Sequence, residues 1–410
     1  MLKVPPTRPG PALRPGATFR SHLMDADLRL LGGAVLLPGA GLQHVGLTLA
    51  DGQIAAIDAA PGPARQRFDA TGLWVLPGIV DLHGDAFERQ LQPRPGVDFP
   101  APLALADTEA QLLANGITTA YLGVTLSWEP GLRSVATWHA LRDALAVHRG
   151  ACDLRVHLRW EAFNLDALDT ALADIAAGLV ALLAFNDHTP AILDRLGDPA
   201  AAAKYIERSG VSPAAFAALA ARVAERGAEV PAAQARLAQA ARAAEIPMAS
   251  HDDATLAERA RFRALGVRIC EFPMAEAVGE AARAAGEFVV MGSPNVLRGR
   301  SHLGWASAAR LAEAGVCSVL TSDYFYPALA RAALILAGRG VLDLERAWAL
   351  VAATPAAAAG LADRGRIAAG LRADLVLLAP AGADRPARLV ATIAAGRLAW
   401  TDAEGARRIL

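Results

Sequence analysis

The middle of the chain alternates short apolar runs with longer stretches rich in alanine, leucine and arginine. There are eight such runs, each with the length of a buried strand, and most precede a helical stretch. Continuous apolar strands that alternate with helices indicate a parallel sheet covered on both faces. Eight units over this length favour a (β/α)8 TIM-like barrel over an open doubly wound sheet, and the sequence lacks the G-x-G-x-x-G pattern of dinucleotide-binding folds. The predicted strands are Ile79–Leu82, Ile117–Val124, Leu154–Trp160, Leu179–Phe185, Ile246–Ala249, Val267–Phe272, Phe288–Met291 and Val316–Leu320.

Shorter β-rich segments lie toward both ends of the chain. Asp51-Gly52 separates two of them, and this dipeptide is typical of a tight β-hairpin turn. We expect a small β-sandwich domain over residues 25–78 and 360–410, a barrel over residues 79–359 and a disordered tail over residues 1–24. The alanine-rich segment Pro213–Glu245 predicts a helical hairpin before the fifth barrel strand. The small domain's predicted strands are Ala34–Leu37, Val45–Ala50, Ile54–Ile57, Trp74–Leu76, Ala373–Leu378 and Leu389–Ala395.

The charges of the chain nearly cancel. Its 410 residues include 40 basic and 41 acidic ones, and 54% of the residues are hydrophobic. The chain therefore has enough apolar residues to form a large core. It has no basic excess of the kind that binding to nucleic acid requires. No apolar run approaches the roughly 18 residues of a membrane helix, so we expect neither nucleic acid nor a membrane as a partner. The cysteines Cys152, Cys270 and Cys317 are widely spaced, which argues against a disulfide framework and favours the cytoplasm.

Polar residues follow the predicted barrel strands where each strand ends. His83-Gly84-Asp85 follows the first strand, and in an extended backbone positions i and i+2 point the same way. Active sites of this barrel lie at the C-terminal ends of the strands, so side chains from five strands are expected to converge there. The six candidate metal ligands are His83, Asp85, Glu161, His188, His251 and Asp323.

Three imidazoles and three carboxylates are too many for one tetrahedral ion, but they suit two divalent ions that share a carboxylate. This donor set fits Zn, Mn or Fe, and no thiolate demands a softer ion. Many binuclear barrel hydrolases use a carboxylated lysine as the shared ligand, yet lysine occurs only at Lys3 and Lys204, and neither ends a predicted strand. We therefore predict that Glu161 bridges the two ions.

Several segments resemble the amidohydrolase superfamily. The segment from Leu76 to His83, the late pair Ser322-Asp323 and the return strand within 365–376 are similar to its usual motifs. That resemblance implies a barrel flanked by a small β-domain from both termini. A narrower similarity points to one branch, the alpha-D-ribose 1-methylphosphonate 5-triphosphate diphosphatases of the carbon–phosphorus lyase pathway. Its segments are His83-Gly84-Asp85, 93–98, 157–161, Asp187-His188-Thr189-Pro190, 250–255, 291–295, 298–302 and Ser322-Asp323-Tyr324.

The resemblance implies hydrolysis of a phosphorylated small molecule, the ribosyl triphosphate, to the 5-phosphate and diphosphate. Two divalent ions would lower the pKa of a shared water toward neutrality. Asp323 would accept a proton from that water and return it to a leaving oxygen, while His302 would donate a proton or stabilise the transition state. A triphosphate also needs cations at the mouth of the barrel. The candidates are Arg298, Arg300, Arg94, Arg89 and Lys204.

Some residues near these segments have more than one interpretation. His157 lies inside the third predicted strand, where a structural role in the core is favoured over metal ligation. Asp252 and Asp253 could orient His251 or cap the helix that follows. The superfamily usually carries the two later histidine ligands on strands five and six, whereas His188 and His251 follow the fourth and fifth predicted strands here.

Two other functions stay open at the level of sequence. A binuclear C–N hydrolase, such as a deaminase or cyclic amidase, would use the same ligands but would surround them with apolar walls and amide-type donors. A non-enzymatic assembly protein that has lost its metals would show degraded ligand positions, and here all of them are filled. A homo-oligomer is expected only by association with other barrel hydrolases.

Overall fold

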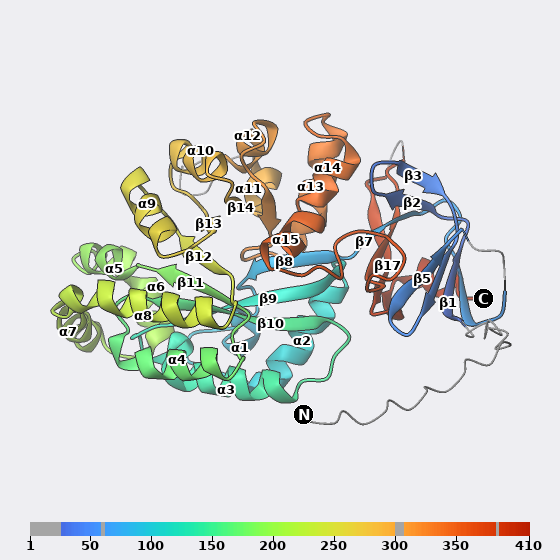
Figure 1. The fold of residues 1–410 in the computed structure, drawn as a ribbon. Coiled ribbons are helices and arrows are strands. Elements are labelled where there is room, and N and C mark those ends of the chain that lie inside the picture. Colours follow the sequence, from blue (N-terminus) through green and yellow to red (C-terminus); the bar gives the residue numbers. More distant parts are fainter. Residues whose placement is uncertain (1–25, 59–61, 300–306, 383–384) are drawn as a thin grey trace, which may run out of the picture.

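The computed structural model describes residues 26–58, 62–299, 307–382 and 385–410 (Figure 1). Three of the predictions lie outside these residues. They are the tail over residues 1–24 and the two loop residues Arg300 and His302.

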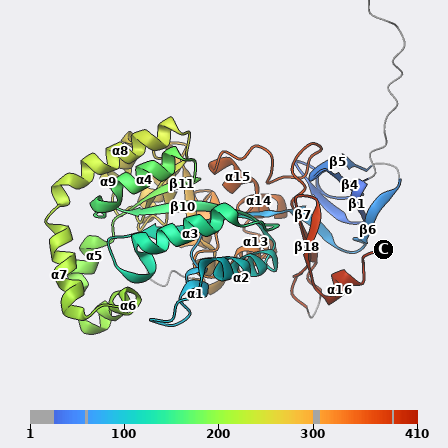
Figure 2. The same cartoon turned by 90° about the horizontal axis from the view of Figure 1, so that it is seen from below.

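Eight parallel strands form the central sheet, and each pairs with the next along the chain. They coincide with the eight predicted runs, so the predicted (β/α)8 barrel is confirmed. Their continuous apolar character follows from burial on both faces, because helices cover the outside of the sheet (Figures 1 and 2). The strands are β8 (Ile79–Gly84), β9 (Ile117–Leu126), β10 (Asp153–Glu161), β11 (Leu182–Asn186), β12 (Met248–His251), β13 (Ile269–Glu271), β14 (Phe288–Gly292) and β15 (Val319–Thr321).

The barrel closes where β8 meets β15. Gly84 and Asp323 form a parallel bridge, and the Asp323 amide donates to the carbonyl oxygen of His83 over 2.9 Å. The buried Asp81 carboxylate reinforces this seam, because its Oδ1 accepts from the Thr321 hydroxyl at 2.5 Å and from the Ser322 amide at 3.0 Å. The seam therefore fixes Asp323 beside the segment that follows β8.

Helices connect the barrel strands, and most of them bury an apolar face against the sheet. A 3-10 turn also occurs at Gly131–Arg133, Leu165–Ala167 and Gly227–Glu229. The helices outside the insert described below are α1 (Glu88–Leu91), α2 (Ala101–Leu113), α3 (Val135–Val147), α4 (Leu168–Ala176), α9 (Leu256–Ala264), α10 (Glu276–Ala284), α11 (Ser293–Arg298), α12 (Ala308–Glu313), α13 (Ala328–Gly338), α14 (Leu344–Ala349), α15 (Ala353–Ala358) and α16 (Ala403–Ala406).

Two sheets built from both ends of the chain lie beside the barrel and share a buried apolar core (Figure 1). The Asp51-Gly52 turn joins two of their strands as predicted, with φ of 51° and 77°, the left-handed values that such a hairpin turn requires. The first sheet has the order β5 (Gln53–Ile57), β4 (Leu47–Ala50), β1 (Ala26–Leu31), β6 (Ala64–Asp69). The second has the order β18 (Arg397–Thr401), β17 (Arg388–Ala394), β16 (Leu375–Ala379), β7 (Trp74–Pro77), β2 (Ala34–Leu37), β3 (Gly41–His44).

A single glycine, Gly78, links β7 of the terminal sheets to the first barrel strand. A methyl group at this position would lie 2.4 Å from the Thr118 hydroxyl and 2.8 Å from Cβ of Asp374. Only glycine therefore allows the chain to pass this close to β9 and to the C-terminal segment.

The insert between β11 and β12 is larger than predicted. The expected hairpin is present as α7 (Pro213–Ala224) and α8 (Val230–Ala243), but α5 (Thr189–Arg195) and α6 (Pro199–Ser209) precede it. Asp198 caps α6 by accepting from the amides of Ala200 and Ala201, and Pro199 occupies its first position. The insert lies at the end of the barrel away from the terminal sheets (Figures 1 and 2).

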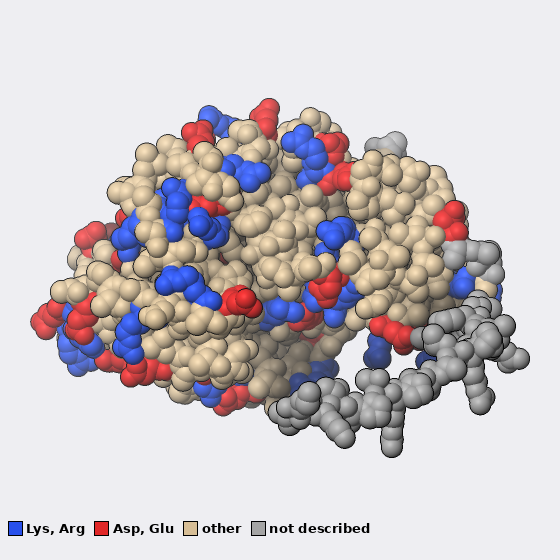
Figure 3. All heavy atoms as spheres, in the orientation of Figure 1, with Lys and Arg blue, Asp and Glu red and all other residues tan. Residues whose placement is uncertain are grey.

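Acidic and basic side chains are interspersed over the face shown in Figure 3, in agreement with the nearly balanced charge of the chain. Among the described residues, no helix combines the length and apolar character that crossing a bilayer requires.

A buried ionic network holds the loop after β12. The side chain of Arg259 on α9 is 1% exposed and lies 3.0 Å from the Asp253 carboxylate and 3.1 Å from that of Glu287. It also donates to the Ser250 hydroxyl at 2.6 Å and to the carbonyl oxygen of Val267 at 3.0 Å. These contacts tie α9 to the strands on either side and fix the backbone that carries His251.

We expect Arg259→Met to lower the free energy of unfolding by about 3 kcal/mol, because the buried Asp253 carboxylate loses its counter-charge, whereas Glu287 keeps its pair with Arg263. Urea denaturation measures this change. Arg226→Met is the matched control, since Arg226 is exposed and its ion pairs with Asp166 and Glu229 are open to solvent. Equal stability of the two variants would show that the network contributes nothing.

Candidate metal centre

Side chains from six barrel strands or the loops directly after them converge at one end of the barrel. Strands β8, β10, β12 and β13 each end on or next to a histidine or carboxylate, and so do the turn between β11 and α5 and the segment after β15, which carries Asp323. Parallel strands place their C-terminal ends on one rim, which explains why residues so distant in sequence meet. The convergence predicted from the sequence is therefore seen.

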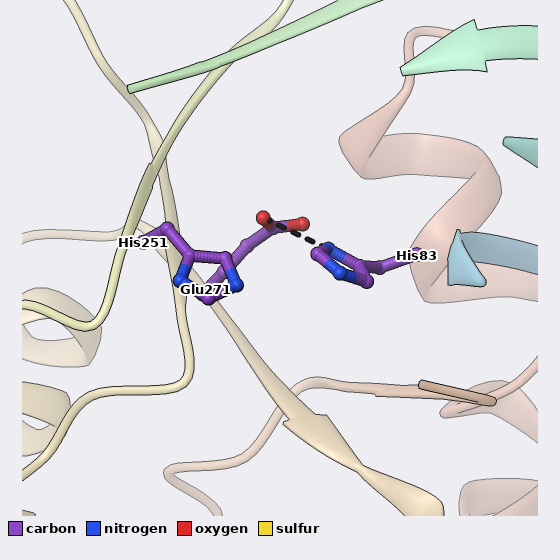
Figure 4. Close-up of side chains that lie close together, drawn as sticks. All are labelled: His83, His251 and Glu271. Carbon is purple, nitrogen blue, oxygen red and sulfur yellow. Dashed lines mark hydrogen bonds and ion pairs between the residues drawn. The ribbon is translucent and has the colours of Figure 1, made fainter. Parts of the chain in front are cut away.

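Glu271, the last residue of β13, lies at the centre of this group. Its Oε2 is 3.2 Å from Nδ1 of His83, and both side chains are almost completely buried. Figure 4 shows the carboxylate directed at His83, with the ring of His251 on its other side. Oε1 of Glu271 makes no hydrogen bond with any described residue. A buried carboxylate with a free oxygen beside two imidazoles is suited to a cation.

His157 packs against the same group from β10. Its Nδ1 faces the carbonyl oxygen of Leu82 at 3.0 Å, and its Nε2 lies 3.7 Å from Glu271. Burial lowers the pKa of His157 to about 3, so the ring is neutral. Burial, followed by the charge of Arg159, also lowers the pKa of His83 well below its ordinary value. Two neutral imidazoles therefore flank the Glu271 carboxylate.

His188 is held by two carboxylates. Glu161 accepts from its backbone amide at 2.7 Å and lies 3.0 Å from Nδ1, while Asp252 lies 3.6 Å from Nε2. Burial alone would lower the pKa of His188, but Glu161 and Asp252 outweigh it and raise the value to about 9. A metal ion bound at Nε2 would replace the proton held there. In this arrangement Glu161 orients His188 through both the backbone amide and Nδ1, and its bridging of two ions stays a prediction.

Arg159 extends into the middle of the group. Its Nη1 lies 3.3 Å from Asp85, its Nη2 lies 3.2 Å from Nε2 of His251, and the residue is 4% exposed. The guanidinium thus places a single positive charge among the candidate ligands. Binding of a cation through Nε2 of His251 requires this side chain to move aside.

Asp323 lies across the barrel seam from Asp85, whose amide donates to the carbonyl oxygen of Asp323 over 3.0 Å. Burial, and after it the charge of Asp85, raises the pKa of Asp323 to about 8. Its backbone has a φ of 56°, and two other residues just after barrel strands, Asp252 and Phe272, have φ of 61° and 51°. These left-handed conformations are costly for residues other than glycine and cluster at functional sites.

Two groups of described residues have ligand atoms within 4.8 Å of one another, and they share His251. The first contains His83, His251 and Glu271, and the second contains His188, His251 and Asp252. Imidazole nitrogen and carboxylate oxygen suit Zn, Mn and Fe, and the buried Glu271 Oε1 lacks a hydrogen-bond partner among the described residues. The residues present therefore fit the binding of a divalent cation.

The predicted ligands His83, His188 and His251 lie in these two groups, whereas Asp85, Glu161 and Asp323 lie around them. Asp252 was expected to orient His251 or to cap α9. It contacts His251 at 3.1 Å, but the cap of α9 is Thr255, which forms a reciprocal pair of hydrogen bonds with Glu258. Asp253 does not cap the helix either, because it belongs to the Arg259 network.

A cavity of about 700 Å³ opens over this group and continues toward the insert. Among the predicted substrate-binding residues, Lys204 lines it. Arg298 is exposed at the end of α11, Arg94 is exposed after α1, and Arg89 donates to the carbonyl oxygen of Tyr324, so these three lie outside its lining. The cationic residues of the lining are Arg133, Arg159, Arg195, Lys204, Arg208 and Arg261.

Glu271 and Arg159 were missed as candidates because both lie within runs read as buried strands. A usable signal was present, since a charged residue inside a continuous apolar strand must find a partner in the interior. A charged side chain inside an otherwise apolar strand, such as Glu271 or Arg159, therefore indicates a candidate functional site.

The chain matches the model of the amidohydrolase family over residues 103–399. It is 33% identical over 345 residues to alpha-D-ribose 1-methylphosphonate 5-triphosphate diphosphatase of Escherichia coli K12, a match that covers 81% of this chain and 90% of that protein. A shorter match, 32% identical over 170 residues, links it to allantoinase of Deinococcus radiodurans and covers 40% of this chain and 34% of that protein.

Solved structures share the fold. A crystal structure of D-aminoacylase aligns with a TM-score of 0.61 at 17% identity and covers 92% of this chain and 97% of that one. Molinate hydrolase aligns with a TM-score of 0.60 at 15% identity and covers 91% of this chain and 95% of that one. Together with the family match over most of the barrel, these findings identify the chain as a member of the amidohydrolase family.

Proposed function

We propose that this hydrolase cleaves the triphosphate of alpha-D-ribose 1-methylphosphonate 5-triphosphate, releasing diphosphate and leaving the 5-phosphate. The Escherichia coli diphosphatase that acts on this substrate is matched over nine-tenths of its length. The observation that carries the proposal is a cavity whose wall combines His188, His251 and Asp252 of the candidate metal centre with several cationic side chains. Such a cavity suits a polyanion that is hydrolysed at one of its phosphorus atoms.

The proposed metal ligands are His83, His188, His251, Glu271 and Asp252, with Asp85, Glu161 and Asp323 placed around them. Two divalent cations held there would supply acidification of water and neutralisation of phosphate charge. We propose that two ions are bound and that they are Zn, Mn or Fe. Glu161 orients His188, and Glu271 supplies the buried negative charge beside His83 and His251.

Asp323 is proposed to transfer a proton from the attacking water to the leaving group. Its carboxylate accepts a proton from the attacking water and then delivers it to the oxygen of the departing diphosphate, so that the bond broken is that between the α-phosphorus and the bridging oxygen. Its position across the barrel seam from Asp85 supports this role, and divalent cations held nearby would favour the ionised carboxylate that can accept the proton.

The other residues predicted to bind substrate or donate a proton lie away from the lining of the cavity or outside the described residues. Arg300 and His302 lie outside the described residues. Arg89, Arg94 and Arg298 would contact a substrate only where it extends beyond the cavity described above.

A C–N hydrolase of the same family is the second candidate, favoured by the partial match to an allantoinase. The cationic lining separates the two, because a neutral cyclic amide does not need several arginines around it. We also propose a cytoplasmic location, since the three cysteines are buried and free, and a homo-oligomeric state by analogy with other barrel hydrolases.

The purified, metal-loaded protein is expected to convert the ribosyl triphosphate to diphosphate and the 5-phosphate. Phosphorus NMR distinguishes diphosphate from orthophosphate as the product. Allantoin and a cyclic amide serve as competing substrates. Release of single orthophosphates, or turnover of the amides alone, would contradict the proposal.

Asp323→Asn is expected to reduce kcat by a factor of about 100 or more, because the isosteric amide cannot accept the proton. Steady-state diphosphate release measures the loss, and the thermal unfolding curve checks the fold. Asp169→Asn, at a side chain that is 89% exposed, serves as the control with unchanged activity. Near wild-type turnover by the Asp323→Asn variant would exclude Asp323 as the proton acceptor.

Glu271→Gln is expected to weaken metal binding by about 10- to 100-fold, because it removes the buried charge next to His83 and His251 while keeping the shape. Titration with Zn against a competing chelator reports the affinity without relying on activity. Glu276→Gln on α10 is the control. If a folded Glu271→Gln variant bound Zn with unchanged affinity, Glu271 would not be a metal ligand.

A further inference from the structure

Three cationic side chains surround one aromatic ring in the wall of the cavity. Nζ of Lys204 lies 4.7 Å from the ring centroid of Tyr205, and Cζ of Arg208 lies 5.0 Å from it. Arg195 donates from Nη1 to the Tyr205 hydroxyl over 2.7 Å. The ring itself is 5% exposed and packs with Ile192 and Phe216 in a small apolar cluster. Three like charges are thus held around a rigid centre, which we call the Tyr205 cluster.

Only part of this positive charge is neutralised by the protein. Arg208 forms a bidentate pair with the buried Glu129, at 2.8 Å and 2.6 Å. Within the described part of the chain, no carboxylate lies within the 4.0 Å of an ion pair from Lys204 or Arg195, although Asp194 also lines the cavity.

A neighbouring ion pair lies in the wall of the same cavity. Arg133 lines the same cavity and bonds through two nitrogens to Glu88, each at 2.9 Å. Burial, and then the charge of Arg133, lowers the pKa of Arg208, which shows that the two guanidinium groups act on each other. Glu88 and Glu129 balance these two guanidinium groups, so the positive charge left for a ligand comes from Arg195 and Lys204.

The insert fixes the distance between this cluster and the metal centre. Arg195 lies at the end of α5, and that helix starts immediately after His188. Seven residues of helix correspond to about 10 Å, so α5 acts as a spacer between the two. Both ends border the same cavity. A ligand that reaches from one to the other must therefore be elongated and anionic at its far end.

We propose that the Tyr205 cluster is a binding site for a phospho-oxyanion of the substrate that lies away from the bond being broken. This inference rests on the proposed function and adds the position of a second anionic group. Arg195 and Lys204 supply the charge-assisted hydrogen bonds, Arg208 is held in place by Glu129, and the Tyr205 hydroxyl keeps Arg195 oriented.

Two groups of the substrate share this chemistry. One is the terminal phosphate of the triphosphate, and the other is the methylphosphonate on the far side of the sugar. Both are tetrahedral, multiply charged oxyanions, and both lie several bonds from the α-phosphorus. The experiment therefore contains one probe for each.

The test uses the double variant Arg195→Gln/Lys204→Gln in the metal-loaded protein. Both side chains are exposed, so the fold should be retained, and a thermal unfolding curve checks this. We expect KM for the ribosyl triphosphate to rise at least 10-fold while kcat changes less than threefold, because the reacting group is untouched. Arg236→Gln on α8, whose side chain is 57% exposed, is the control.

Calorimetric titration with inorganic diphosphate and, separately, with methylphosphonate assigns the source. Diphosphate binding weakened 10-fold in the double variant identifies the terminal phosphates, and weakened methylphosphonate binding identifies the phosphonate. Unchanged binding of both probes together with an unchanged KM would overturn the subsite. Tyr205→Phe, which keeps the ring and removes the hydroxyl that orients Arg195, is expected to give a smaller rise in KM.

The same data separate this proposal from the proposed function. A wild-type protein that does not hydrolyse the ribosyl triphosphate, but whose diphosphate affinity still depends on Arg195 and Lys204, would refute the proposed reaction and leave the anion site standing. If the protein hydrolysed the ribosyl triphosphate but bound diphosphate and methylphosphonate independently of Arg195 and Lys204, the proposed reaction would stand and the anion site would be refuted.

Discussion

The seam between the first and the eighth barrel strands is the constraint on which the site depends. Asp81, buried in β8, accepts hydrogen bonds from the hydroxyl of Thr321 and the amide of Ser322, so the two strands lie in one fixed register. This register places Asp323 opposite the segment of His83 and Asp85, although about 240 residues separate them in sequence. Without closure, the candidate proton acceptor and the first ligand would belong to opposite edges of an open sheet.

Charge balance inside the rim follows from that geometry. Carboxylates from several strands cannot be brought together without cations, and the chain supplies Arg159 and the protonated His188 among them. Divalent cations would do the same with more charge and firmer geometry. The left-handed backbones at Asp252, Phe272 and Asp323 show that the chain accepts local strain to aim these side chains.

Most of the fold could be predicted from the sequence because both faces of every barrel strand are buried, which leaves continuous apolar runs. The candidate histidine ligands were predictable for a related reason, since each lies within three residues of the end of such a run. Glu271 was hidden because its strand has only three residues and the predicted run extended past it. Arg298 was expected near the substrate, but its place at the exposed end of α11 depends on packing that no local pattern reports. The Tyr205 cluster likewise depends on how α5 and α6 meet.

The scarcity of lysine has a practical consequence. Lys204 is the one lysine in the described part of the chain, the other being Lys3, and its ammonium group is exposed over the ring of Tyr205. Within the described part of the chain, an amine-selective acylating reagent therefore has a single lysine target, located in the wall of the cavity. A fluorophore attached there would report on occupancy of the cavity without any engineered residue.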